Sequence, residues 1–259
     1  MKQDQPIGFF DSGIGGLSVL HEALKILPRE NYVYFSDGDN APYGVRPKEE
    51  VRDLVLKAVE FIAAQQVKAI VIACNTATSV AIEDIRKRYD IPVIGMEPAV
   101  KPAVTSGNRK RVLVFATELT LKEEKFRNLV ERVDTHQLVD YLPLQELVMF
   151  AERFDFDGDK IIPYLKNKLA GIDLGNYGAV VLGCTHFLFF KNFMEKVIPP
   201  EIAIIDGNFG TVKNLKTRLE GNLNEGPGSV TYFLSGKAAE PARFEKFLHY
   251  LDTCELHAV

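Results

Sequence analysis

The sequence lacks several features that mark specialised classes of protein. It has no tryptophan and a net charge of only −4 over 259 residues, and its three cysteines are Cys74, Cys184 and Cys254. Three cysteines without CxxC spacing are too few for a disulfide framework and are not typical of a zinc site. A mildly acidic chain has no overall attraction for nucleic acid or for an anionic membrane. We therefore expect no metal and no nucleic-acid or membrane partner.

Long apolar runs are missing as well. No stretch approaches the ~18 consecutive apolar residues that a membrane-spanning helix needs. The first residues lack the apolar core of a signal peptide. The basic cluster Arg86–Arg88 is interpreted as the solvated end of a helix rather than as a nucleic-acid patch. Together these absences predict a protein of the reducing cytoplasm.

Short apolar runs alternate with amphipathic stretches along the whole chain. Ile7–Phe10 is a typical buried strand, and apolar residues then recur at helical spacing from Leu17 to Leu27. This alternation predicts a parallel-rich α/β architecture. The same patterns predict one continuous helix over residues 121–133 and another that begins after His186 and reaches Val197.

A glycine-rich turn, Asp11–Gly16, joins the first expected strand to the first expected helix. Its glycines would let backbone amides approach an anion at the start of that helix. The turn lacks the Gly-Lys-Ser/Thr ending of a P-loop and matches the dinucleotide fingerprint poorly. A bare turn would explain the glycines equally well, and Asp11 would then serve as a helix cap.

Two of the expected strands end on a cysteine that polar residues follow. Asn75 and Thr76 come after Cys74, and Thr185–His186 comes after Cys184. Free cysteine is often simply buried, but core packing does not require polar neighbours. Cys254 has no such setting and is interpreted as structural.

A cysteine where a strand turns into a helix suits proton transfer. The positive end of the helix dipole can lower the pKa of the thiol below its usual ~8.5. Two thiols on opposite sides of a small ligand can remove a proton from one face of a carbon and deliver one to the other. Such a pair inverts a stereocentre without a cofactor.

The order of elements is repeated within the chain. A similar length of sequence separates Asp11 from Cys74 and Thr117 from Cys184. We therefore predict two similar α/β domains related by a pseudo-twofold axis, with an active-site cleft between them. The first would comprise residues 1–97 and 208–259, and the second residues 98–207. Chance similarity between two hydrophobic strands is the alternative explanation.

Four motifs carry a resemblance to a known family. They are Phe10–Gly16, Pro42–Gly44, Ala73–Ala77 and Gly183–His186. In these motifs the sequence resembles the glutamate racemases of the aspartate/glutamate racemase superfamily. The resemblance implies two α/β domains, a cofactor-independent isomerase with two thiols, and a supply of D-glutamate for peptidoglycan. It also implies a homodimer.

The resemblance also implies roles for individual residues. Cys74 would abstract the α-proton of D-glutamate, and Cys184 that of L-glutamate. Asp11 and His186 would adjust the two thiols, and Glu152 would assist near the second. The residues implied to bind the substrate are Asp11, Ser12, Pro42, Tyr43, Gly44, Asn75, Thr76, Thr117, Thr120, Thr185 and His186.

Two stretches depart from the family pattern. Phe187–Phe190 stands where the family often has proline, and Leu142–Val148 fits poorly. The second departure bears on Glu152, for which an exposed helix carboxylate is the alternative interpretation. Tyr43 would otherwise be ordinary loop packing, and His186 would otherwise form a hydrogen bond that stays clear of the thiol. Alternative functions are racemization of aspartate or hydantoins, and non-catalytic binding of a small anion between two lobes.

Overall fold

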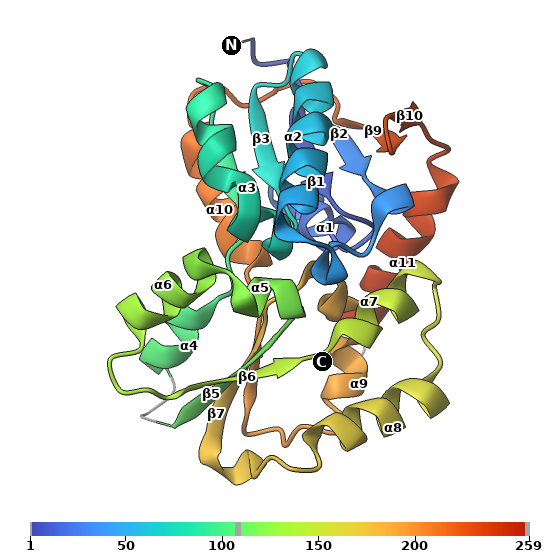
Figure 1. Cartoon of the computed structure of the whole chain (residues 1–259). Helices are drawn as coiled ribbons and strands as arrows, with labels where there is room; N and C mark the ends of the chain where they lie inside the picture. The colour runs from blue at the N-terminus through green and yellow to red at the C-terminus, as the bar shows by residue number, and fades with distance from the viewer. Residues whose placement is uncertain (1, 107–109, 257–259) are drawn as a thin grey trace.

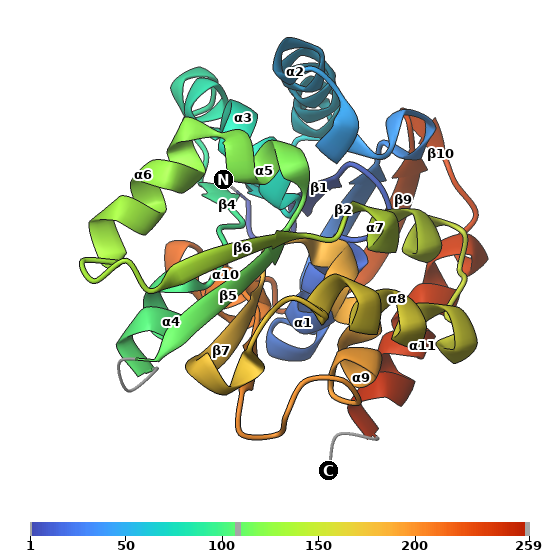
Figure 2. The same cartoon turned by 60° about the horizontal axis from the view of Figure 1, so that its bottom comes forward.

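The chain forms two separate β-sheets, one above the other in Figure 1. A computed structural model describes residues 2–106 and 110–256. Each sheet is built mainly from parallel strands and is covered by helices, so the predicted parallel-rich α/β fold is confirmed. Figure 2 shows the second sheet and its helices in front of the first.

The first sheet is parallel except at one edge, where β10 runs antiparallel to β9. Its strands are, in spatial order, β10 (Lys237–Ala238), β9 (Ser229–Leu234), β2 (Asn31–Ser36), β1 (Ile7–Asp11), β3 (Ala69–Ile72) and β4 (Val93–Gly95). Every residue of β1 and β3 is buried, as expected for central strands with helices on both faces.

Helices cover both faces of this first sheet. Phe10 and Ile72 pack on one face against α2 (Lys48–Ala64) and α3 (Asn75–Arg88). Phe9 and Val71 point the other way. The helices on that second face are α1 (Leu17–Ile26), α10 (Asn208–Arg218) and α11 (Ala242–Leu256).

The second sheet is parallel throughout. Its strands are, in spatial order, β6 (Val139–Pro143), β5 (Arg111–Ala116), β7 (Tyr177–Leu182) and β8 (Ala203–Ile205). Its helices are α4 (Val100–Ser106), α5 (Glu118–Lys122), α6 (Glu124–Val133), α7 (Gln145–Glu152), α8 (Gly158–Leu169) and α9 (Lys191–Met194). Short 3-10 helices complete the chain: η1 (Gly38–Asn40), η2 (Tyr43–Val45), η3 (Leu174–Asn176) and η4 (Thr185–Phe190).

Both predicted continuous helices are wrong. Glu123 has an extended backbone and divides residues 118–133 into α5 and α6, while its carboxylate pairs with Lys48 at 2.7 Å. After His186 the chain forms η4 and the one-turn α9. A 3-10 helix aligns residues three apart, and the fully buried Phe187 and Phe190 have that spacing.

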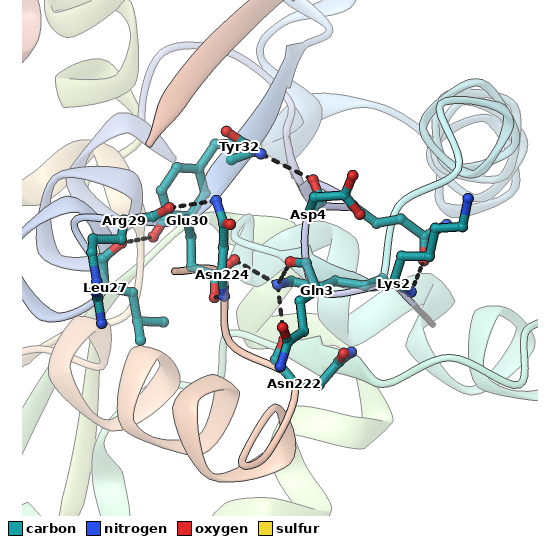
Figure 3. Close-up of polar contacts among 12 residues, drawn as sticks. Lys2, Gln3, Asp4, Leu27, Arg29, Glu30, Tyr32, Asn222 and Asn224 are labelled. Carbon is teal, nitrogen blue, oxygen red and sulfur yellow. Dashed lines mark hydrogen bonds and ion pairs between the residues drawn. The ribbon is translucent and has the colours of Figure 1, made fainter. Parts of the chain in front are cut away.

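A buried ion pair fastens the first residues of the chain and the loop between α10 and β9 to the first sheet. The Lys68 ammonium, fully buried, lies 2.7 Å from the Glu30 carboxylate. It also donates to the carbonyls of Gln3 and Asn222, at 2.6 and 2.9 Å (Figure 3). The other Glu30 oxygen accepts from the Asn224 amide. Removing one partner of such a pair typically costs about 3–5 kcal/mol, because the other charge stays buried.

The strands of the two sheets come from different parts of the chain. The first sheet uses residues 7–95 and 229–238, and the second uses residues 111–205. The division into residues 1–97 with 208–259 and residues 98–207 remains our proposal. Helix α11 contacts both parts, since Phe247 packs on Phe154 with ring centroids 4.9 Å apart.

Candidate active site

Parallel pairing brings the predicted polar turns and cysteines to the same sheet edges. In the first sheet Phe10 pairs with Ile72, so the turn after β1 and Cys74 after β3 lie side by side. In the second sheet Phe115 pairs with Leu182, so the turn after β5 lies beside Cys184, which follows β7. The carboxyl ends of neighbouring parallel strands are where α/β proteins bind ligands.

Cys74 caps helix α3 and is 5% exposed. Its sulfur accepts a hydrogen bond from the Ala77 amide at 3.4 Å and donates one to the Ser12 hydroxyl at 3.6 Å. Burial raises the pKa of this thiol to about 12, and the Asp11 carboxylate adds to the increase. The expectation that the helix N-terminus lowers the pKa is therefore wrong for Cys74, which holds its proton.

Cys184 begins η4 and is 7% exposed. Its sulfur lies 3.7 Å from Nδ1 of His186, and Nε2 of that ring lies 2.7 Å from Glu152 Oε1. Burial lowers the pKa of His186, but the bonds to Cys184 and Glu152 outweigh it and raise the pKa well above 6.5. The ring is therefore an imidazolium with an acidic group at each nitrogen.

Glu152 joins the two halves of the site. Its Oε1 also accepts from the backbone amide of Ile14 at 2.9 Å, in the turn before α1. A Cβ at Gly13 would collide with this carboxylate, so the glycine is needed for the approach. The interpretation of Glu152 as an exposed helix carboxylate is wrong. The anion expected at the glycine turn is supplied by the protein itself.

Asp11 is fully buried, and the donors that bond its carboxylate are neutral groups. Its Oδ1 accepts from the Gly13 amide at 2.8 Å, and its Oδ2 accepts from the Thr185 hydroxyl at 3.1 Å. Burial raises the pKa of this carboxyl from 3.8 to about 6, against the attraction of His186. Asp11 is the last residue of β1 in the first sheet but reaches Thr185, beside Cys184.

Thr117 belongs to the second half of the site and contacts the first. It follows β5 of the second sheet, and its hydroxyl lies 3.0 Å from that of Thr76 beside Cys74. Thr120 completes the cluster, at 3.0 Å from Thr76 and 2.9 Å from Thr117. All three threonines are buried. Hydroxyl hydrogen bonds therefore join the two halves beside each cysteine: Thr76 to Thr117 near Cys74, and Thr185 to Asp11 near Cys184.

A small cavity lies between the two cysteines. Its lining residues are Ser12, Pro42, Tyr43, Gly44, Cys74, Asn75, Thr76, Thr117, Gln145, Val148, Cys184 and His186. Four predicted residues lie outside this lining. Thr120 contacts the lining residue Thr76 and Glu152 contacts the lining residue His186, while Asp11 and Thr185 bond to each other. The cavity has a volume of about 10 Å³, roughly the space for one water. The halves must separate before a ligand the size of an amino acid enters.

Tyr43 lines the cavity but its hydroxyl is already engaged. It donates to Asp37 Oδ2 at 2.5 Å, and the ring packs on Phe10. The side chain therefore fits the alternative of loop packing. Cys254, by contrast, lies on α11 beside a separate pocket with His21 and Phe209.

Sequence reasoning missed two lining residues, Gln145 and Val148 of α7. Both lie in the stretch that departs from the family pattern, so no motif indicated them. Among the residues that the structure describes, neither buried atom of the Gln145 carboxamide has a hydrogen-bond partner, and the same is true of Asn75 Oδ1. The sequence did offer one signal for a site residue here, because the polar Gln145 directly precedes the apolar face of α7.

The described residues include no group of three or more His, Cys, Asp or Glu side chains arranged to hold a metal ion. Over residues 2–106 and 110–256, no helix is both long and apolar enough to cross a membrane.

Comparison with known proteins decides the family. Residues 17–214 match the family described as Asp/Glu/Hydantoin racemase. The chain belongs to this family. It is 57% identical over 234 residues to glutamate racemase 2 of Bacillus subtilis (strain 168), covering 89% of this chain and 88% of that protein. It is 53% identical over 249 residues to a glutamate racemase of Halothermothrix orenii, covering 95% and 98%.

Solved structures agree in fold. A glutamate racemase isoform from Bacillus anthracis superposes with a TM-score of 0.84 at 28% identity, covering 95% of this chain and 92% of that one. A glutamate racemase from Francisella tularensis, solved in complex with D-glutamate, superposes with a TM-score of 0.82 at 27% identity, covering 96% and 94%.

Proposed function

We propose that this protein is a glutamate racemase that interconverts L- and D-glutamate with two thiols and no cofactor. The observation that carries the proposal is that Cys74 and Cys184, from the two sheets, line one cavity. The relatives and solved neighbours named as glutamate racemases support the choice of substrate.

The two thiols differ in their surroundings. Cys74 keeps its proton, because burial raises its pKa to about 12. The sulfur of Cys184 lies 3.7 Å from His186, whose imidazolium stabilises the negative charge on this sulfur during proton transfer. One thiolate and one thiol are the pair that a racemase needs, since one must accept a proton while the other supplies one.

With L-glutamate bound, the Cys184 thiolate takes the α-proton and leaves an electron pair on the α-carbon. Cys74 delivers its proton to the opposite face, which forms D-glutamate. Cys184 is then the thiol and Cys74 the thiolate, and D-glutamate reacts by the reverse steps. No atom is gained or lost, and each thiol ends with the other's protonation state.

Polar groups around the cavity bind the substrate and stabilise the charge that develops on it. Hydrogen-bond donors on the α-carboxylate delocalise the electron pair of the carbanion, and Asn75, Thr76 and Thr117 line the cavity with suitable groups. Ser12, Pro42, Tyr43 and Gly44 complete the lining toward the first sheet. Asp11, Thr120, Thr185 and Glu152 hold these residues in position.

Exchange of the α-hydrogen in heavy water tests the proposal. Purified protein, without pyridoxal phosphate or metal, should racemize both enantiomers of glutamate and incorporate deuterium at the α-carbon. Aspartate and a hydantoin in the same assay measure substrate choice. Folded protein that neither exchanges nor racemizes glutamate would contradict the proposal.

Three further properties stay predictions, two from the family resemblance and the cytoplasmic location from the sequence itself. We propose that the product D-glutamate serves peptidoglycan synthesis, that the protein is cytoplasmic, and that it forms a homodimer. Light scattering measures the last directly, and cell fractionation the location. Failure of an inactivated strain to recover on D-glutamate would contradict the cell-wall role.

A further inference from the structure

Gln145 is a cavity residue that the two-thiol reaction leaves without a role. It is the first residue of α7, and both atoms of its carboxamide are buried without a hydrogen-bond partner among the described residues. Burying an amide in this way destabilises a folded protein, because the lost bonds to water are not replaced. A leucine in the same place would avoid that cost. The amide therefore has a use that its contacts with the described residues do not explain.

Gln145 lies beside Gly44 in the cavity. Its Oε1 lies so close to Gly44 that a Cβ there would collide with it and with Thr117. Among the described residues, the recorded polar contacts of the two sulfurs are with Ser12, Ala77 and His186. The reacting carbon has to lie between the sulfurs. The end of the cavity near Gly44 and Gln145 is therefore available to the rest of the substrate.

We propose that Gln145 is a specificity-determining residue that binds the distal carboxylate of glutamate. The carboxamide Nε2 donates a hydrogen bond to that carboxylate once the substrate enters. This inference rests on the proposed racemase function. A hydrogen bond to an ionised carboxylate is stronger than one to a neutral acceptor, so the unpartnered amide favours a substrate with a second carboxylate.

Two substitutions test the proposal together with a matched control. Gln145→Leu removes the hydrogen-bonding atoms, and Gln145→Glu keeps the shape but repels a carboxylate. Gln65→Leu makes the same chemical change at the end of α2, outside the cavity lining. The measurements are kcat and KM for both enantiomers, the inhibition constant of 2-aminobutyrate, and the melting temperature. 2-Aminobutyrate keeps the α-ammonium and α-carboxylate but has no distal carboxylate.

We expect Gln145→Leu to raise KM for both enantiomers by about tenfold to a hundredfold, the value of a hydrogen bond to a charged group. The kcat should change by less than about threefold, because this contact is equal in the ground and transition states. Gln145→Glu should raise KM further. The inhibition constant of 2-aminobutyrate should stay within about twofold. Gln145→Leu should melt at the same temperature or higher, and Gln65→Leu should leave KM unchanged.

An unchanged KM in both Gln145 variants would overturn the inference. So would a parallel rise in the inhibition constant of 2-aminobutyrate, since the contact would then be with the α-carboxylate. A fall in melting temperature that accompanies an unchanged KM would indicate a structural residue, and Gln145→Glu repeats the test if the leucine variant does not fold. Wild-type protein that fails to racemize glutamate would contradict the proposed function itself, and the inference would fall with it. Active wild-type protein with unaffected variants would contradict the inference alone.

Discussion

The surroundings of Cys74 and Cys184 differ in charge, although the two cysteines are almost equally buried. Cys74 contacts a neutral hydroxyl and a backbone amide, and Asp11 nearby raises its pKa. Cys184 contacts the His186 imidazolium, which Glu152 holds in place. Similar burial with different neighbours thus gives two identical side chains different surroundings. The difference suits Cys74 to supply a proton and places a cation where negative charge on Cys184 is stabilised.

The two halves also support each other crosswise. Asp11 of the first half bonds to Thr185 beside Cys184, and Thr117 of the second half bonds to Thr76 beside Cys74. Neither cysteine is therefore positioned by its own half alone. Closure of the halves and assembly of the site are one event, which agrees with a cavity of about 10 Å³ in the closed structure.

The largest expected effect comes from removing either thiol. Cys74→Ser and Cys184→Ser should each lower kcat/KM by about 10²–10⁴-fold, the usual contribution of a general acid or base. The factor must be the same in both directions, because the enantiomers are equally stable in water. In heavy water Cys74→Ser should exchange the α-hydrogen of L-glutamate faster than that of D-glutamate, and Cys184→Ser should do the opposite. Full activity in either variant would contradict the two-thiol assignment.

Asp11→Asn should raise stability while it lowers activity. An acid whose pKa is raised by folding destabilises the folded state once it ionises, so the penalty grows from pH 4 to about 6 and is constant above. For a pKa raised from 3.8 to about 6 the penalty is about 3 kcal/mol at pH 8 and about 1 kcal/mol at pH 4.5. Urea unfolding of Asp11→Asn at both pH values measures it. The control is Asp90→Asn at an exposed position, and an equal gain at both pH values would refute the burial argument.

Glu152→Gln should weaken the Cys184 side selectively. Losing the carboxylate lowers the pKa of His186, so the imidazolium disappears at a lower pH than in the wild type. We expect kcat/KM to fall by about tenfold at neutral pH, with the alkaline limb of the pH profile moved to lower pH. Glu146 lies on the same helix and accepts a hydrogen bond from Tyr164 at the surface. Glu146→Gln is therefore the matched control. An unmoved alkaline limb would show that Glu152 does not act through His186.

Cys254→Ser gives the smallest expected effect. This residue lies on α11 beside a pocket separate from the cavity of Cys74 and Cys184. Racemase activity should change by less than about twofold. A large loss would mean that a third thiol takes part and that the comparison of two thiols is incomplete.

The sequence predicted the fold well where local patterns determine it. Apolar runs such as Ile7–Phe10 became buried parallel strands, since their surroundings are apolar on both faces. The helices failed where tertiary contacts overrode periodicity. Glu123 interrupts one helix to pair with Lys48, and Phe187–Phe190 forms a 3-10 helix in which three of the four side chains are fully buried.

Motifs predicted the site in part. They indicated the cysteines and the residues beside them, because those residues are adjacent in sequence. They could not show that Asp11 reaches Thr185 or that Glu152 reaches His186, since those contacts depend on how the halves meet. Gln145 was missed for the same reason. The helix dipole misled the expectation for Cys74, because it was considered without the cost of burial.

The central claim is that Cys74 holds its proton, while His186 supports negative charge on Cys184. The rate at which iodoacetamide alkylates each cysteine, followed by peptide mass spectrometry from pH 6.5 to 9.5, tests it most directly. Opening of the cavity is common to both thiols, so it cancels in the comparison. We predict that the Cys74 rate rises about tenfold per pH unit, because its pKa of about 12 lies above this range, and that Cys184 reacts faster than Cys74 throughout. His186→Asn should slow alkylation of Cys184 and leave that of Cys74 unchanged. A constant rate for Cys74, or equal rates for both cysteines in the wild type, would contradict the account.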